Sequence, residues 1–118
     1  MTQVRSRLSG LYAITDQNLI PDNRFTEYVE AALAGGARIL QYRDKSVDHD
    51  KRLLQAGLCR QLSDEYDALL IINDDIRLAE QVGATGVHLG KDDNDLKVAR
   101  DRLGEQAIIG ISCYNDIE

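Results

Sequence analysis

The sequence predicts an α/β protein, a (β/α)8 barrel of which these 118 residues supply about the first five strands and four helices. Three observations lead to this prediction. Short apolar runs alternate with longer amphipathic stretches, as in parallel βαβ units with right-handed crossovers. The run Leu69–Asn73 is apolar almost throughout, which is typical of a strand buried on both faces. Polar residues follow several runs directly, where α/β proteins place their sites.

The first half of the chain supplies two strand–helix pairs. A strand over residues 11–15 and a turn containing Pro21 precede a helix whose apolar residues recur at helical spacing: Phe25, Tyr28, Val29, Ala32 and Leu33. Gly35 and Gly36 end that helix, a position that glycine often takes. The second strand covers residues 39–43, and the second helix is marked by four leucines: Leu53, Leu54, Leu58 and Leu62.

The second half continues the pattern. The strand over residues 69–73 is followed by a short helix that carries Leu78, Ala79 and Val82 and closes at Gly83. A strand over 86–89, a helix over 96–103 and a strand over 108–112 come next. Asn115 and Glu118 then have the spacing of a capping box. A complete barrel needs about 200 residues, so residues 1–118 are expected to be the N-terminal portion of a single, truncated barrel domain.

An open doubly wound sheet is the alternative architecture. The first strand–helix turn, residues 15–18, lacks a glycine-rich dinucleotide loop, which disfavours a Rossmann fold. A flavodoxin-like sheet remains compatible with a chain of this length.

Composition excludes several functional classes. The net charge of −6 argues against nucleic-acid binding, which requires a basic surface. No apolar run approaches the roughly 18 residues of a membrane span, and the first ten residues lack the apolar core of a signal peptide. Cys59 and Cys113 have no metal-ligand or redox spacing. We therefore expect a cytoplasmic protein with no membrane and no nucleic-acid partner.

Three polar side chains share one face at the end of the second strand. Side chains alternate along a strand, so Gln41, Arg43 and Lys45 point the same way. An amide, a guanidinium fork and an ammonium would suit a polyanion such as diphosphate. The alternative is a solvated turn in which Arg43 and Lys45 pair with Asp44 and Asp48, and this motif alone does not decide between the two.

Acidic and amide residues follow the third and fourth strands. Asn73, Asp74 and Asp75 end the third strand, and residues 92–95 form a second acidic stretch. Mg²⁺ takes one or two carboxylates and completes its shell with water and phosphate oxygens. Helix capping is the alternative role for both stretches. For the first, both roles are compatible, because three polar residues are available.

Two further polar residues lie on strands. His88, inside the fourth strand, is expected to be a hydrogen-bonded structural residue. Ser112 ends the fifth strand with no recognisable base partner, which predicts a hydrogen-bond donor and not a nucleophile.

Taken together, these segments resemble the thiamine phosphate synthase family. The matching pieces, in order, are residues 11–16, 41–45, 72–74, 86–90 with Asp93, and 110–112. The resemblance implies a TIM barrel that condenses hydroxymethylpyrimidine diphosphate with thiazole phosphate and releases diphosphate in a dissociative reaction that depends on Mg²⁺. It implies diphosphate contacts from Gln41, Arg43, Lys45 and Asn73, a hydrogen bond from Ser112, and metal ligation by Asp74 and Asp93.

The sequence departs from the family pattern at Lys91, Cys113 and Tyr114, and the later loops that bind thiazole phosphate are not located. A thiazole tautomerase-like barrel and a non-catalytic fragment that only binds phosphate ligands are the alternatives. Retention of Asn73, Asp74 and Asp93 favours the synthase. Two open sheet edges predict that the chain alone either self-associates into a homo-oligomer or is only partly ordered, and the fragment alone is expected to be inactive.

Overall fold

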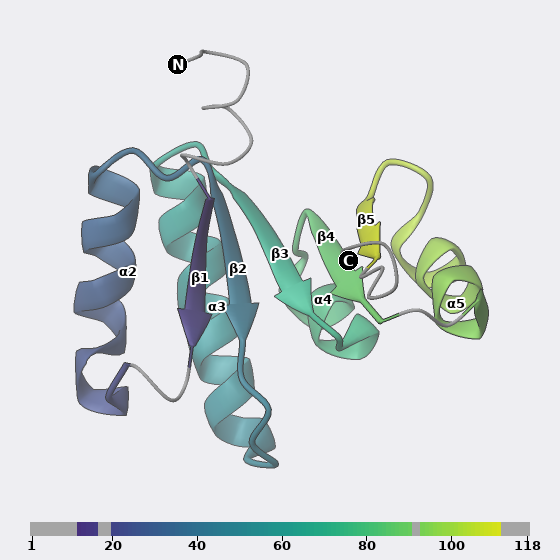
Figure 1. Ribbon diagram of the computed structural model, residues 1–118, viewed down its shortest axis with the longest axis horizontal. Helices are drawn as coiled ribbons and strands as arrows, with labels where there is room; N and C mark the ends of the chain where they lie inside the picture. The colour runs from purple at the N-terminus through teal and green to yellow at the C-terminus, as the bar shows by residue number, and fades with distance from the viewer. Residues whose placement is uncertain (1–11, 17–19, 91–92, 112–118) are drawn as a thin grey trace, which may run out of the picture.

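One parallel sheet forms the framework of the protein (Figure 1). The computed structural model describes residues 12–16, 20–90 and 93–111. Its strands are β1 (Tyr12–Asp16), β2 (Ile39–Arg43), β3 (Leu69–Asn73), β4 (Gly86–Leu89) and β5 (Ile108–Ile111). They are hydrogen-bonded in the order β1-β2-β3-β4-β5. A barrel places successive strands side by side in this way, whereas a flavodoxin-like sheet has the order 2-1-3-4-5. The barrel prediction is therefore confirmed over the flavodoxin-like alternative.

Helices connect the strands and cover one face of the sheet. They are α2 (Phe25–Ala34), α3 (His49–Glu65), α4 (Ile76–Val82) and α5 (Asp93–Leu103), with a short 3-10 helix, η2 (Asp22–Arg24), before α2. Each element predicted from the sequence within the described residues is present, with ends shifted by a few positions. Residue 11 of the first strand and residues 112–118, with the predicted start of a fifth helix, lie outside the described residues. No helix of the described chain is long and apolar enough to cross a membrane.

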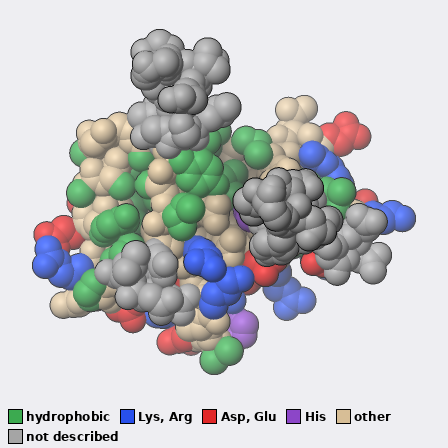
Figure 2. Space-filling model, in the orientation of Figure 1, with side chains coloured by type: hydrophobic (Ala, Val, Ile, Leu, Met, Phe, Trp, Pro, Cys, Tyr) green, Lys and Arg blue, Asp and Glu red, His purple; other side chains and the backbone are tan. Residues whose placement is uncertain are grey.

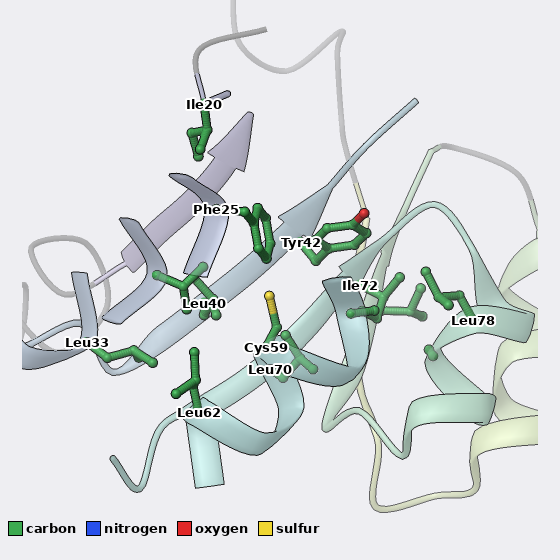
Figure 3. Packing of buried hydrophobic residues seen from close by; sticks show 14 of the residues in the cluster. Ile20, Phe25, Leu33, Leu40, Tyr42, Cys59, Leu62, Leu70, Ile72 and Leu78 are labelled. Atoms are coloured by element: carbon green, nitrogen blue, oxygen red, sulfur yellow. The ribbon is translucent and has the colours of Figure 1, made fainter. Parts of the chain in front are cut away.

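The hydrophobic core lies between the sheet and its helices (Figure 3). Strand residues that face the helices, such as Leu40, Tyr42 and Ile72, are almost completely buried. The ring of Phe25 packs edge-on against Tyr42, with 5.9 Å between ring centroids. Cys59 is a free, buried cysteine of α3, and burial raises the pKa of its thiol to about 12. This thiol is therefore a packing group, because it stays protonated at neutral pH.

Helix α3 buries only part of the face that its leucines indicate, since Leu62 is buried but two of the other leucines are exposed. Leu53 and Leu54 are 45% and 66% exposed. The buried residues of α3 are Gln55, Ala56, Cys59, Leu62 and Ser63. Gln55 faces the sheet because its Oε1 accepts a hydrogen bond of 2.8 Å from the Tyr42 hydroxyl. A hydrogen bond to the core and small residues that allow close packing therefore set the orientation of this helix.

An ion pair between a buried carboxylate and a partly exposed lysine joins the end of β2 to α3. The Asp44 carboxylate accepts a hydrogen bond of 2.7 Å from the backbone N–H of Ser46, and Lys51 Nζ lies 3.0 Å from its other oxygen. Burial alone would raise the pKa of Asp44, but the hydrogen bonds from Ser46 and Lys51 outweigh burial and hold this pKa below the usual 3.8. The pairing of Asp44 with Arg43 or Lys45, considered from the sequence, is wrong, because Asp44 turns toward the helix.

The opposite face of the sheet is largely uncovered. Residues that alternate with the core positions point to this face, and several are apolar and exposed: Tyr12, Ile14, Leu69 and Ile108. Figure 2 shows hydrophobic side chains over β1 and β2 on the side turned to the viewer. The prediction that β3 is buried on both faces holds for Ile71 but not for Leu69, which is 39% exposed.

Two glycines provide a matched test of the packing between β4 and β5. A Cβ added to Gly86 would lie 1.9 Å from the carbonyl oxygen of Ile108, whereas one added to Gly57 on α3 would meet no atom within 4 Å. We expect Gly86→Ala to lower the free energy of unfolding by about 1–3 kcal/mol through overpacking, and Gly57→Ala to raise it by about 0.5–1 kcal/mol. Urea denaturation measures both. Equal effects of the two substitutions would contradict the strand pairing.

The Asp44–Lys51 pair predicts a pH-dependent stability. The folded pKa of Asp44 lies below its unfolded value of 3.8, so its contribution is complete above that pH and is lost as pH falls through the folded pKa. We expect Asp44→Asn to lower the free energy of unfolding by about 1–3 kcal/mol near neutral pH. The difference from wild type should shrink below about pH 4. Asp101→Asn, an exposed change on α5, is the control and should have little effect. A difference independent of pH would refute the assignment.

Candidate functional site

The parallel register brings the ends of β2 and β3 to the same edge of the sheet. Tyr42 pairs with Ile72, so the residues that follow each strand emerge side by side. A cavity of about 190 Å³ lies at this edge and is lined by Asp44, Lys45, Ser46, Arg52, Asn73, Asp74 and Asp75. Figure 2 shows Lys and Arg side chains gathered near the end of β2. The two polar segments predicted from the sequence therefore meet at one place.

Gln41 and Asn73 are joined directly across the two strands. Asn73 Nδ2 donates a hydrogen bond of 3.1 Å to Gln41 Oε1, and Gln41 Nε2 donates one of 2.6 Å to the hydroxyl of Tyr12 on β1. Gln41 is only 5% exposed. Asn73 Oδ1 is buried and accepts no hydrogen bond from the described part of the chain. A buried acceptor in this state is ready to take a donor from a ligand.

Lys45 and Asp74 form the exposed part of the site. Lys45 Nζ lies 3.5 Å from Asp74 Oδ2, and both side chains are about half exposed. Asp74 has a positive φ of 58°, which few residues other than glycine adopt, and its backbone N–H donates to the carbonyl oxygen of His88 at 2.6 Å. That bond fixes the end of β3 against β4. A long, solvated ion pair contributes little stability, so either partner can exchange it for a ligand.

Asp75 has a structural role beside Asp74. Its Oδ1 accepts a hydrogen bond of 2.9 Å from the backbone N–H of Leu78 and so caps α4, while its Oδ2 accepts one of 2.6 Å from Arg52 Nη2. The sequence left capping and metal binding open for residues 73–75. The structure assigns capping to Asp75, and the carboxylate of Asp74 remains accessible.

The remaining cations and carboxylates at this edge are placed as follows. Arg43 is exposed at the end of β2, and its side chain makes no ion pair with the described residues. Asp48 caps α3 by accepting a hydrogen bond from the backbone N–H of Lys51. The solvated-turn alternative is therefore wrong for Asp44, whose carboxylate binds Lys51.

His88 lies on β4 beside a glycine of β5. A Cβ at Gly110 would lie 2.9 Å from His88 Nδ1, so the absence of a side chain at position 110 makes room for the imidazole. This close packing agrees with the structural role expected for His88.

Several predicted site residues cannot be compared with the structure. Asp93 begins α5, but its side chain is not among those described. Ser112, Lys91, Cys113 and Tyr114 lie outside the described residues. Within the described residues, no group of three or more His, Cys, Asp or Glu side chains is arranged to hold a metal ion. The Mg²⁺ pair of Asp74 and Asp93 therefore stays a prediction.

The sequence interpretation missed two contributors to the site. Tyr12 reaches Gln41 from the neighbouring strand, and Arg52 holds Asp75 from α3. Alternation along the first strand places Tyr12 on the same face as Gln41 once the strands are paired, so strand pairing would have revealed it. No sequence signal indicates Arg52, because its contact depends on how α3 packs.

Comparisons with known proteins identify the family. The family model for thiamine monophosphate synthase matches residues 11–118. The chain is 55% identical over 112 residues to the thiamine-phosphate synthase of Chromobacterium violaceum, covering 95% of this chain and 54% of that protein. The thiamine-phosphate synthase of Alcanivorax borkumensis is 52% identical over 111 residues, with 94% of this chain and 51% of that protein covered.

A solved structure agrees with these sequence comparisons. The thiamine phosphate pyrophosphorylase from Pyrococcus furiosus superposes with a TM-score of 0.79 at 39% identity, covering 94% of this chain and 52% of that one. The chain thus spans about half the length of the relatives it matches. On these matches, which extend over nearly all of its residues, the chain belongs to the thiamine monophosphate synthase family.

Proposed function

We propose that this chain forms part of a magnesium-dependent transferase. The enzyme would be a thiamine phosphate synthase, which condenses hydroxymethylpyrimidine diphosphate with thiazole phosphate and releases diphosphate. The observation that carries the proposal is the meeting of two polar segments at one sheet edge. Gln41 and Asn73 are joined at 3.1 Å, and Lys45 and Asp74 lie 3.5 Å apart. The identity of about half its residues to named thiamine-phosphate synthases supports the same function.

The cations at the end of β2 suit a departing diphosphate. Arg43 is exposed and makes no ion pair with the described residues, so its guanidinium can bind phosphate oxygens through two N–H groups. Lys45 can exchange its long ion pair with Asp74 for a phosphate oxygen. Charge that develops on the leaving group is then stabilised by groups already in place, which requires no covalent nucleophile.

Asp74 fits a Mg²⁺ ion that is shared with the diphosphate. Its carboxylate is half exposed and lies beside a cation at long range, so an ion could take over that contact. Mg²⁺ commonly takes one or two carboxylates and completes its shell with water and phosphate oxygens. Asp93 would be the second carboxylate, since it begins α5 after the neighbouring strand β4. The bound ion would supply additional positive charge beside the leaving group.

Two other functions are less well supported. A thiazole tautomerase-like barrel would have no use for a metal and diphosphate set, yet Asn73, Asp74 and Asp93 are all present. A fragment that only binds phosphate ligands is compatible with a chain half the length of its relatives. We place the protein in the cytoplasm, in keeping with its free, buried Cys59, and expect a homo-oligomer.

The proposal predicts ligand binding without turnover for the 118-residue chain by itself. We expect calorimetry to detect magnesium-dependent binding of the pyrimidine diphosphate, because Arg43, Lys45 and Asp74 are in place. A coupled diphosphate-release assay should show no synthesis, and sedimentation should show self-association through the exposed apolar face of the sheet. Failure to bind the pyrimidine diphosphate would refute the proposed function. A monomer with full turnover would show that the barrel count is mistaken.

The metal assignment predicts a selective effect of Asp74. Asp74→Asn should weaken magnesium-dependent diphosphate binding by about thirtyfold, equivalent to about 2 kcal/mol, and raise the magnesium concentration required. Asp67→Asn is a matched control, since Asp67 precedes β3 and has nearly the same positive φ, 59° against 58°. Asparagine tolerates this backbone conformation, so both variants should fold. Titrations at varied magnesium concentration measure the effect. An unchanged magnesium dependence in Asp74→Asn would show that Asp74 is not a ligand.

A further inference from the structure

A hydrogen-bonded row of three side chains crosses the uncovered face of the sheet. It begins at Tyr12 on β1, passes through Gln41 on β2 and ends at Asn73 on β3. Each member belongs to a different strand, and the two bonds measure 2.6 Å and 3.1 Å. The row therefore transmits the orientation of one side chain to the next.

The direction of this row determines which atom Asn73 presents to a ligand. Gln41 uses its nitrogen on the Tyr12 hydroxyl, so its oxygen faces Asn73 and receives the Asn73 nitrogen. Asn73 Oδ1 is then left buried, without a donor from the described residues. In the reverse direction, Gln41 Nε2 would donate to Asn73 Oδ1, and Asn73 would present its N–H groups.

Tyr12 is the member of the row that allows the observed direction, because its hydroxyl oxygen accepts the N–H of Gln41. A hydroxyl donates or accepts, whereas the nitrogen and oxygen of an amide have fixed roles. Tyr12 is 37% exposed, so its proton can go to water while its oxygen accepts from Gln41. Gln41, at 5% exposure, has no such freedom. An unpaired N–H in its position would be unfavourable, and the Tyr12 oxygen prevents this.

We propose that Tyr12 is a positioning residue that holds the Gln41 amide in one orientation and thereby makes Asn73 Oδ1 a hydrogen-bond acceptor for the ligand. The group that Asn73 Oδ1 receives is an N–H or O–H donor, such as the amino group of the pyrimidine or a water bound to the metal. An unprotonated diphosphate oxygen cannot donate to Asn73 Oδ1, so the expected contact of Asn73 with the diphosphate would use the second N–H of Asn73 Nδ2, the one that Gln41 does not receive. The identity of the ligand rests on the proposed function, whereas the row itself does not.

The first experiment tests the row without any ligand. Side-chain amide signals of Gln41 and Asn73 are assigned by NMR in the wild-type chain, in Tyr12→Phe and in Tyr28→Phe. Tyr28 is a matched control because it is a similarly exposed tyrosine, on α2, that makes no hydrogen bond through its hydroxyl with the described residues. Tyr12→Phe should shift the amide signals of both Gln41 and Asn73, and Tyr28→Phe should shift neither. A shift confined to Gln41, or in neither residue, would overturn the proposal, and the same spectra show whether each variant is folded.

The second experiment tests the chemistry of the ligand. Calorimetry compares pyrophosphate without metal, pyrophosphate with Mg²⁺, and the pyrimidine diphosphate with Mg²⁺. Tyr12→Phe should weaken binding by about tenfold, the typical effect of one misplaced hydrogen bond, only where a donor is present. If Tyr12→Phe loses affinity for both magnesium-containing ligands, the donor to Asn73 Oδ1 is a metal-bound water. If it loses affinity for the pyrimidine diphosphate alone, the donor is the amino group of the pyrimidine.

The outcomes separate this inference from the proposed function. An equal loss for metal-free pyrophosphate, which offers no donor, would show that the effect of Tyr12→Phe does not pass through Asn73 Oδ1, and the inference would fail while the function stood. Unchanged binding of all three ligands in Tyr12→Phe would also overturn it. If the wild-type chain bound no pyrimidine diphosphate, the proposed function would fail, and the amide signals would decide the role of Tyr12.

Discussion

The parallel register between β2 and β3 is the constraint on which the candidate site depends. Gln41 pairs with Ile71 and Tyr42 with Ile72. In this register Gln41 and Asn73 lie on one face of the sheet, close enough for a hydrogen bond, while Tyr42 enters the core. A slip of one residue would exchange the two faces of a strand and bury Gln41 among hydrophobic side chains. The large apolar area of the core therefore enforces the geometry of the polar site on the other side of the sheet.

The start of α3 divides the acidic residues into structural and accessible ones. Lys51 forms an ion pair with Asp44, which follows β2. Its neighbour Arg52 forms one with Asp75, which follows β3. Two adjacent cations of one helix thus anchor the segments after two adjacent strands. Asp74 and Lys45 lie next to the anchored residues and face each other in solvent. Exposed charges beside anchored segments are a suitable arrangement for binding an anion without rearranging the fold.

The local sequence pattern was sufficient to predict the helices, the strands and the position of the site. It was not sufficient to predict which side chains the site residues contact. Short apolar runs identified each strand, and the rule that sites lie at the carboxyl ends of strands brought Gln41 and Asn73 together. The partner of Asp44 could not be predicted, because Lys51 reaches it only once α3 packs against β2. The buried face of α3 was predicted only in part for the same reason: Leu62 is buried as expected, but tertiary packing buries Ala56 and Cys59 in place of Leu53 and Leu54. Barrel and flavodoxin-like orders also share one local pattern, and only strand pairing separates them.

The uncovered face of the sheet links the fold to the hydrogen-bonded row. Ile14 and Leu69 are exposed on this face, while Gln41 among them is already buried. The solved relative is about twice as long and matches this chain over half of its own length, so further structure is available in that protein to cover the equivalent face. Excluding water strengthens hydrogen bonds and makes an unpaired amide more unfavourable. Covering this face would therefore fix the direction of the row from Tyr12 to Asn73 more firmly, because water could no longer replace a missing partner.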